Sequence, residues 1–254
     1  MTKILLHKKT CAVLRTVGVI LFWILFWWGC AALYAKPAIF PTPIGVFKAF
    51  LFMLKDAQMY LSIGNSLLHV LSGLLMGSVI GVLFGVLIAR FEIAHAFLAP
   101  AFSVARSTPV VCFILLAWVF LGSQVLPAFV SAVAPVMLSA TAGAIREIDP
   151  RLKEVATVYR LSLAKRIRAI YLPNVLPAVR ISLITCVGLA WKSCVAAEMI
   201  AFSNHTVGYG IWFARTAEMD YDTVFAWTII IVTISILFEK ITKAILTPKK
   251  RGAQ

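Results

Sequence analysis

The chain has 254 residues, of which 61% are hydrophobic and 13% are charged, and its mean hydropathy is +0.95. A soluble domain carries about a quarter charged residues, and one water-soluble core of this size cannot enclose so much apolar surface. The composition therefore excludes an ordinary soluble domain and predicts a protein that has lipid as its solvent.

A net charge of +14 is also typical of nucleic-acid binders. Those proteins gather Lys and Arg on one exposed face, whereas here the basic residues lie in short segments between apolar runs. This placement is typical of membrane topology, so nucleic-acid binding is not expected.

Cysteine and histidine are scattered along the chain. The five cysteines form no C-x-x-C pair and lie mostly inside apolar runs, and the four histidines are far apart. We therefore expect neither a metal site nor a disulfide framework. The cysteines are expected to pack as small apolar residues.

The first uncharged run covers Val17–Ala35 and is long enough to cross about 30 Å of hydrocarbon. A secretory signal is the alternative because basic residues precede the run, but signal cores are about 7–15 residues long and no clear A-x-A site follows. Later runs bring the expected total to about six membrane-spanning helices: Ser66–Ala89, His95–Leu121 (broken by Pro100 and Pro109), Leu126–Ile145, Leu176–Phe202 and Val224–Leu246. Lys36–Asn65 and Ser203–Asp222 are expected as the two larger loops on one side.

The basic residues outside the runs predict the orientation. Most of them lie before the first run, between the fourth and fifth, or after the sixth, whereas Lys36, Lys48, Lys55 and Arg215 are the ones expected on the opposite side. Because Lys and Arg are enriched in cytoplasmic segments, both termini and the connection between spans four and five are expected in the cytoplasm.

The second run contains a glycine at every fourth position, at Gly73, Gly77, Gly81 and Gly85. Such a stripe lets another helix approach closely. The partner helix is expected either within the same subunit or in a second subunit.

The connection between spans four and five, Arg146–Pro173, predicts two short amphipathic helices. Asp149 followed by Pro150 is typical of a helix start, and Ser162 can cap a second helix that Pro173 ends. One apolar face is formed by Leu152, Val155, Ala156 and Tyr159, and the other by Leu163, Ile167, Ile170 and Tyr171, opposite Lys165, Arg166 and Arg168. The faces suit either the membrane surface or a groove on a cytoplasmic partner.

Within this connection, Glu154-Val155-Ala156 followed by Leu172-Pro173 resembles the EAA loop of binding-protein-dependent ABC importer permeases. Glu154, Ala156, Ile170, Leu172 and Pro173 fit that pattern. Val155 replaces one alanine of the pattern, and Arg160 stands where the family has glycine, which is expected to alter the turn between the two helices. Other segments resemble the nitrate, sulfonate and taurine branch: Ala105–Pro109, Ala190–Met199 and Val207–Gly210.

The resemblance implies an all-α integral membrane protein with the MetI-like type I permease fold. It implies one permease domain over residues 1–254, with a coupling loop at 146–173. Expected partners are a second permease subunit, as a homodimer, cytoplasmic ATP-binding subunits and an external solute-binding protein. The chain has no G-x-x-x-x-G-K-[ST] phosphate loop, so no catalytic residue or cofactor is expected on it, and ATP and Mg belong to the partner ATPase. The residues implied in ATPase coupling are Glu154, Val155, Ala156, Tyr159, Arg160, Leu161 and Pro173.

Arg106, Lys192 and Glu198 are ionisable residues inside predicted spans. Because a charge in the membrane is costly and usually functional, we expect Arg106 and Lys192 to line the translocation path or its gate, with Glu198 as counter-charge. A helix–helix ion pair that only stabilises the bundle is the alternative. His69 is expected to be a hydrogen-bonded packing residue rather than a ligand.

Other membrane functions are disfavoured. A secondary transporter often has internal repeats and paired carboxylates near the midplane, and a membrane enzyme needs a nucleophile and base or a metal set such as H-E-x-x-H; the chain has none of these patterns. A channel would need polar rings along a pore. The branch resemblance implies a small organic anion such as a sulfonate as substrate, and a heterocycle such as a thiamine precursor is the alternative.

Overall fold

The computed structural model describes residues 2–34, 39–121 and 126–246, with side chains from residue 14 onward except 106, 117, 121 and 126–131. Every regular element in these residues is a helix. The backbone divides into two compact units, unit 1 (residues 1–59 and 211–230) and unit 2 (residues 60–210 and 231–254).

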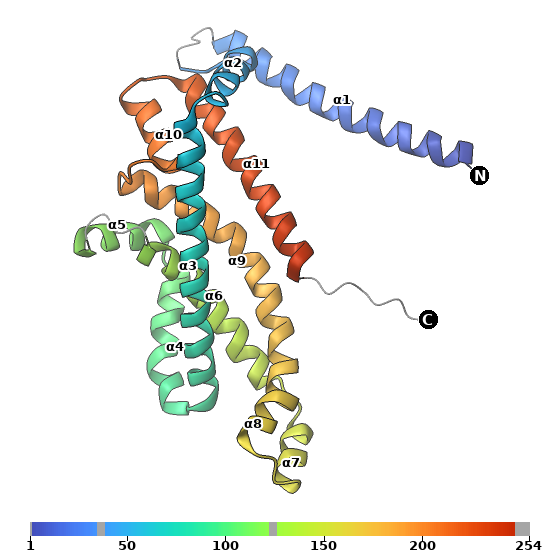
Figure 1. Ribbon diagram of the computed structural model, residues 1–254, viewed down its shortest axis with the longest axis vertical. Coiled ribbons are helices and arrows are strands. Elements are labelled where there is room, and N and C mark those ends of the chain that lie inside the picture. The colour runs from blue at the N-terminus through green and yellow to red at the C-terminus, as the bar shows by residue number, and fades with distance from the viewer. Residues whose placement is uncertain (1, 35–38, 122–125, 247–254) are drawn as a thin grey trace. The chain divides into compact units, whose positions relative to one another are not determined.

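Unit 1 holds α1 (Thr2–Tyr34), α2 (Pro43–Met53) and the first part of α11 (Tyr221–Leu246). Unit 2 holds most of α3 (Ala57–Arg90), the end of α11 and the helices between them (Figure 1): α4 (Glu92–Ser107), α5 (Val110–Leu121), α6 (Leu126–Arg146), α7 (Pro150–Val158), α8 (Leu163–Arg166), the π-helical turn η1 (Ile167–Tyr171) and α9 (Leu172–Ile200). Helix α10 (Val207–Thr216) begins in unit 2 and ends in unit 1.

Four helices of the described chain are long and apolar enough to cross a membrane: Leu14–Tyr34, Ala57–Arg90, Leu163–Ile200 and Tyr221–Leu246. The third predicted span is instead a pair of helices, α4 and α5, bent by 100°. The bend follows from Pro109, which has no N–H to continue α4 and which favours an extended Thr108 (φ −79°, ψ 133°). If the bent pair is counted as one span, the described residues contain five candidate membrane spans, whereas the sequence predicted about six.

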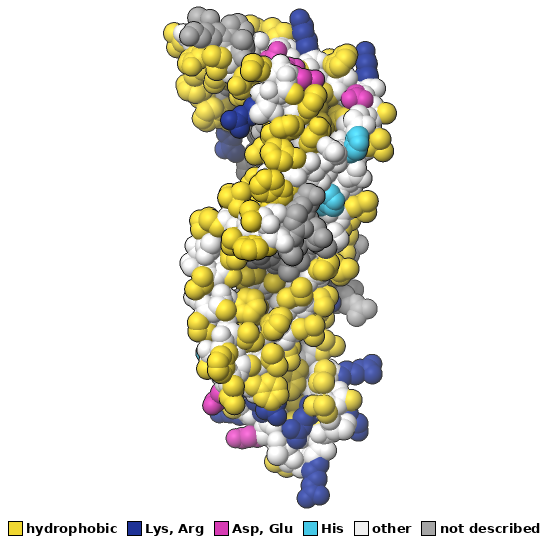
Figure 2. Space-filling model, turned by 90° about the vertical axis from the view of Figure 1, so that its left-hand side faces the viewer, with side chains coloured by type: hydrophobic (Ala, Val, Ile, Leu, Met, Phe, Trp, Pro, Cys, Tyr) yellow, Lys and Arg dark blue, Asp and Glu magenta, His cyan; other side chains and the backbone are white. Residues whose placement is uncertain are grey.

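The fourth predicted run forms α6, whose part with described side chains, Ala132–Arg146, is shorter than a full span. The two larger loops expected on one side also contain helices, because α2 lies in the first and α10 in the second. Figure 2 shows hydrophobic side chains over the flank of unit 2 and Lys and Arg at its lower end, where Figure 1 places α7 and α8. This distribution suits a lipid-facing flank with a polar end.

The core of unit 2 is built where α9 packs against α3, α5 and α6. Trp191 is 1% exposed, and its Nε1 donates a hydrogen bond to the carbonyl oxygen of Ile231 over 3.2 Å. Cys186 and Cys194 are fully buried in this core. The prediction that cysteines pack as small apolar residues is confirmed for Cys186, whereas the buried Cys194 thiol also donates a hydrogen bond to a carboxylate.

The glycine stripe of α3 packs against α6 within the same chain. A Cβ placed on Gly77 would lie 2.7 Å from the Cβ of Val133, and one placed on Gly81 would lie 2.6 Å from the carbonyl oxygen of Ala134. Both distances are shorter than real Cβ contacts, so only glycine permits this approach. Of the two partners considered for the stripe, the structure selects a helix of the same subunit.

In unit 1, aromatic side chains join α1 to the start of α11. The rings of Trp27 and Phe225 stack at 5.8 Å, and the Nε1 of Trp27 donates to the carbonyl oxygen of Pro41 over 3.1 Å. Thr42 then caps α2 by accepting a hydrogen bond from the Gly45 N–H, with Pro43 at the first helical position.

Candidate functional site

The connection after α6 folds as a small helical hairpin, α7 followed by α8, which we call the α7–α8 hairpin. Its start is as predicted: the Asp149 carboxylate accepts a hydrogen bond from the Arg151 N–H over 2.8 Å, and Pro150 occupies the first helical position. The cap satisfies an N–H group that would otherwise lack a partner at the start of α7.

Helix α7 ends in a Schellman motif. The Leu161 N–H bonds to the carbonyl oxygen of Ala156 and the Arg160 N–H to that of Thr157, at 3.0 and 3.1 Å. Arg160 has φ = 45°, the left-handed conformation that usually requires glycine at this position. The arginine at the family's glycine position therefore adopts the backbone conformation that glycine favours.

Arg166 holds this turn from the second helix. Its Nε donates to the carbonyl oxygen of Leu161 and its Nη2 to that of Ala156, both over 3.1 Å. The sequence placed Arg166 on the basic side of the second helix, opposite its apolar face, and did not predict that its guanidinium fork would reach two carbonyl oxygens, one in the last turn of α7 and one in the turn after it. No local pattern signals a contact between residues ten positions apart.

Ile148, Ala156 and Ile170 form a small buried core inside the hairpin, with Leu161, Tyr171 and Val175 packed against it. Ala156 therefore points inward, away from the exposed side chains with which the periodicity grouped it. Ser162 occupies the capping position before α8, but no hydrogen bond from its side chain caps that helix.

Pro173 does not end the second helix, contrary to the prediction. Residues Leu163–Ile200 run on as one helical stretch through η1. The Leu172 N–H bonds to the carbonyl oxygen of Ile167, five residues back, and the Asn174 side chain donates to the carbonyl oxygen of Ile170 over 2.7 Å. The wider π-helical turn and the asparagine accommodate a proline that has no N–H to donate.

The hairpin exposes several large apolar side chains. Val158 is 78% exposed, and Tyr159 and Leu163 are each 74% exposed. Glu154 and Val155 are exposed on α7 beside them. Exposed apolar side chains on a surface hairpin are typical of a docking surface.

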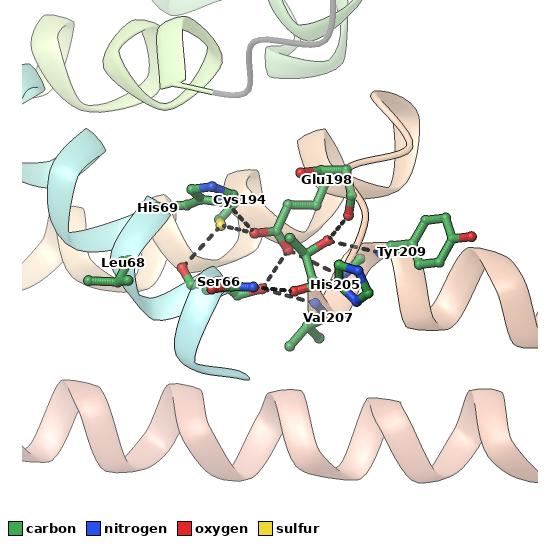
Figure 3. A network of polar contacts seen from close by, with 12 residues as sticks. Ser66, Leu68, His69, Cys194, Glu198, His205, Val207 and Tyr209 are labelled. Carbon is green, nitrogen blue, oxygen red and sulfur yellow. Dashed lines mark hydrogen bonds and ion pairs between the residues drawn. The ribbon is translucent and has the colours of Figure 1, made fainter. Parts of the chain in front are cut away.

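Glu198 lies at the centre of a second cluster, between α3, α9 and the start of α10 (Figure 3), and is fully buried. The Ser66 hydroxyl donates to its Oε2 over 2.7 Å, and the Gly208 N–H donates to the same oxygen over 3.2 Å. His69 Nδ1 lies 2.9 Å from Oε1, and the Cys194 thiol donates to Oε1 over 3.3 Å. The carboxylate is therefore satisfied by polar neighbours from three segments, as a buried charge requires.

The Glu198 cluster also holds the start of α10. The Val207 N–H donates to Ser66 Oγ over 2.9 Å, so Ser66 and Glu198 together accept from successive N–H groups at this helix start. Gly208 is packed so closely that an added Cβ would lie 2.5 Å from the Cβ of Glu198. The sequence expected His69 to be hydrogen-bonded and did not identify Ser66 or Gly208 as partners.

Lys192 and Glu198, two of the three predicted charged residues, are not brought together. Lys192 is exposed on α9 and forms no ion pair with Glu198 among the described side chains. The side chain of Arg106 lies outside the described residues. Within the described side chains, no group of three or more His, Cys, Asp or Glu residues is arranged to hold a metal ion.

Comparison with known proteins places this architecture in a family. Residues 77–252 match the family described as binding-protein-dependent transport system inner membrane component. The taurine transport system permease protein TauC of Escherichia coli (strain K12) is 26% identical over 260 residues, which cover 97% of this chain and 90% of that protein. The nitrate import permease protein NrtB of Leptolyngbya laminosa is 28% identical over 180 residues, which cover 67% of this chain and 62% of that protein.

The fold is also found in a solved structure. A bacterial ABC transporter involved in the import of the acidic polysaccharide alginate superposes with a TM-score of 0.65 at 16% identity, covering 96% of this chain and 98% of that chain. With its apolar helices and its family match, the chain belongs to the binding-protein-dependent transport system inner membrane components and is a multi-pass ABC importer permease of the nitrate, sulfonate and taurine type.

Proposed function

We propose that this chain is the membrane-spanning subunit of an ATP-driven importer and forms the translocation path for a small anion. An external binding protein delivers the anion, a second copy of the chain completes the path, and separate cytoplasmic subunits hydrolyse ATP. Both termini and the α7–α8 hairpin face the cytoplasm in this proposal.

The observation that carries the proposal is the rigid, apolar α7–α8 hairpin. Its turn is fixed by the Schellman bonds and by Arg166, so the exposed Tyr159 and Leu163 are presented in a fixed geometry. The hairpin continues into α9 with no break in the helical stretch Leu163–Ile200. A partner that moves the hairpin would therefore move α9 as a rigid body, which is how domain closure reaches a distant site.

An anionic substrate is supported by the relatives. The relatives above are named for taurine, which carries a sulfonate group, and for nitrate, which is an inorganic oxyanion. A heterocycle such as a thiamine precursor is the second candidate. Competition of uptake by unlabelled taurine, nitrate or a thiamine precursor distinguishes the two.

The proposal is tested by co-expressing the chain with its candidate ATPase and purifying the pair from membranes. We expect the wild-type pair to co-purify and Glu154→Lys to abolish this, because the substitution reverses a charge on the exposed face of α7. Glu92→Lys, the same charge reversal on an exposed residue of α4, is the matched control and should leave the complex intact.

Solute uptake into vesicles decides between the importer and an ion-coupled secondary transporter. Uptake that needs ATP and the ATPase supports the importer. Uptake that persists without ATP and follows an ion gradient, with no complex in the wild type, would refute it.

Arg106, Lys192 and Glu198 remain our proposed residues of the translocation path or gate, with Glu198 acting through the buried cluster it organises. Arg106→Met and Lys192→Met should lower uptake while the subunits still assemble. Normal uptake in both variants would leave these residues with a structural role only.

A further inference from the structure

An open cavity of about 570 Å³ lies in unit 2 along α4, between the end of α3 and the second half of α6. Its apolar wall includes Ile88 of α3, Phe102 of α4 and Leu138 of α6. Its polar groups come from two helices: His95, Ser103 and Ser107 from α4, and Ser139 and Arg146 from α6. The volume lies within the range of small-molecule sites, which is about 300–1,000 Å³.

The polar wall of this cavity is positive and rich in donors. Among the side chains that the structure describes, no Asp or Glu lines it. Arg146 forms no ion pair with any described residue, and the side chains of His95 and Ser103 form no hydrogen bond there. A guanidinium, an imidazole and a hydroxyl, all on solvent-exposed side chains, thus line the same space without a protein partner among the described residues.

We propose that this cavity is an oxyanion-binding site. The planar guanidinium of Arg146 can donate two parallel hydrogen bonds to a sulfonate, nitrate or phosphate group, and such charge-assisted pairs are the strong hydrogen bonds of proteins. His95 and Ser103 supply further donors from α4. Ile88, Phe102 and Leu138 provide an apolar wall for a short carbon chain attached to the oxyanion.

The position of the cavity gives the site a role. Arg146 is the last residue of α6, and Ile148, two residues later, belongs to the buried core of the α7–α8 hairpin. An anion held by Arg146 is thus bound next to the element proposed to dock the ATPase. That the occupant is the imported solute on its way to the cytoplasm rests on the proposed function, whereas the oxyanion chemistry rests on the cavity alone.

The site is tested by equilibrium binding of radiolabelled methanesulfonate to the full-length chain in nanodiscs of phosphatidylcholine, with nitrate and inorganic phosphate as competitors. We expect saturable binding that Arg146→Met weakens by about 10-fold or more and that His95→Gln weakens less, because the first loses a charged bidentate donor. Arg151→Met, which removes an exposed arginine that does not line the cavity, is the matched control and should bind as the wild type.

A second arm separates a free solute from a lipid headgroup, which offers the same oxyanion chemistry. If the native occupant is lipid, phosphatidylglycerol is retained on the purified wild-type chain in native mass spectrometry, is lost in Arg146→Met, and competes with methanesulfonate. Binding of neither ligand, or binding that Arg146→Met and His95→Gln leave unchanged, would overturn the site. If no oxyanion binding is found but the chain still co-purifies with its ATPase, the oxyanion site is refuted and the proposed importer function is not.

Discussion

Two positions of this chain favour glycine, one because of its backbone conformation and the other because of close packing. Only the second of them is a glycine. Arg160 stands at a left-handed position with φ = 45° and keeps its side chain exposed. Gly208 stands where the backbone of α10 contacts Glu198 and Met199 directly. The first position carries strain, and the second avoids it.

Replacing Arg160 by glycine should therefore stabilise the α7–α8 hairpin. A left-handed conformation costs a non-glycine residue about 1–2 kcal/mol, and part of this gain is offset because glycine makes the unfolded chain more flexible. Hydrogen exchange at the Leu161 amide should slow in Arg160→Gly. Lys153→Gly, a glycine in the middle of α7, is the control and should speed exchange across that helix, since glycine is unfavourable there. Faster exchange at the Leu161 amide in Arg160→Gly would show that the left-handed conformation of Arg160 does not destabilise the hairpin.

Replacing Gly208 by alanine should destabilise unit 2. The new Cβ would lie 2.6 Å from the Met199 backbone nitrogen, so the start of α10 must move away from Glu198. Overpacking of this kind costs about 1–3 kcal/mol. The thermal midpoint of the purified chain should fall, while Gly188→Ala, with nothing within 4 Å of its added Cβ, should leave the midpoint unchanged or raise it. Equal thermal midpoints for the two variants would show that the close packing at Gly208 does not affect stability.

At the scale of elements, the contact of α3 with α6 depends on the glycine stripe, and the α7–α8 hairpin depends on its caps. The stripe was visible in the sequence because its period of four places the glycines on one helix face. The start of α7 was visible because Asp149 and Pro150 act locally. The end of the second helix was predicted wrongly, because the π-helical turn that accommodates Pro173 has no signal at the level of single residues.

Substituting one glycine of the stripe tests the contact of α3 with α6. In Gly81→Ala the Cβ would lie 2.6 Å from the Ala134 carbonyl oxygen and from the Met137 Cβ, so the two helices must separate. We expect a loss of about 1–3 kcal/mol in the free energy of unfolding, seen as a lower yield of folded protein and a lower thermal midpoint in detergent. Gly64→Ala in the same helix meets nothing within 4 Å and should behave as the wild type. An unaffected Gly81→Ala would exclude the close approach.

For the whole molecule, the placement of Lys and Arg predicts the orientation in the membrane. We expect a cysteine introduced at Val158, on α7, to react with a membrane-impermeant maleimide only in inverted vesicles. A cysteine at Phe47, on α2, should react from the outside of intact cells. Both positions are exposed, and the native cysteines are replaced beforehand, Cys112 included because it too is exposed. The opposite labelling pattern would show that the topology is reversed and that the hairpin cannot contact a cytoplasmic ATPase.

The sequence by itself determined the membrane class, the helical runs, the start of α7 and the family resemblance. These features depend on composition, on periodicity and on contacts between residues close together in the chain, all of which can be read in order. These features depend little on how the helices pack against one another.

Only the tertiary structure decided which groups meet. His69 and Val207 contact Glu198 and Ser66 across 129 and 141 residues of sequence, and the cavity lined by His95 and Arg146 exists because α4 packs against α6. Glu198 was expected as the counter-charge of Arg106 and Lys192, yet packing placed polar groups of α3 and α10 around its carboxylate. A buried charge takes the donors that surround it in space, and the order of residues along a chain does not specify them.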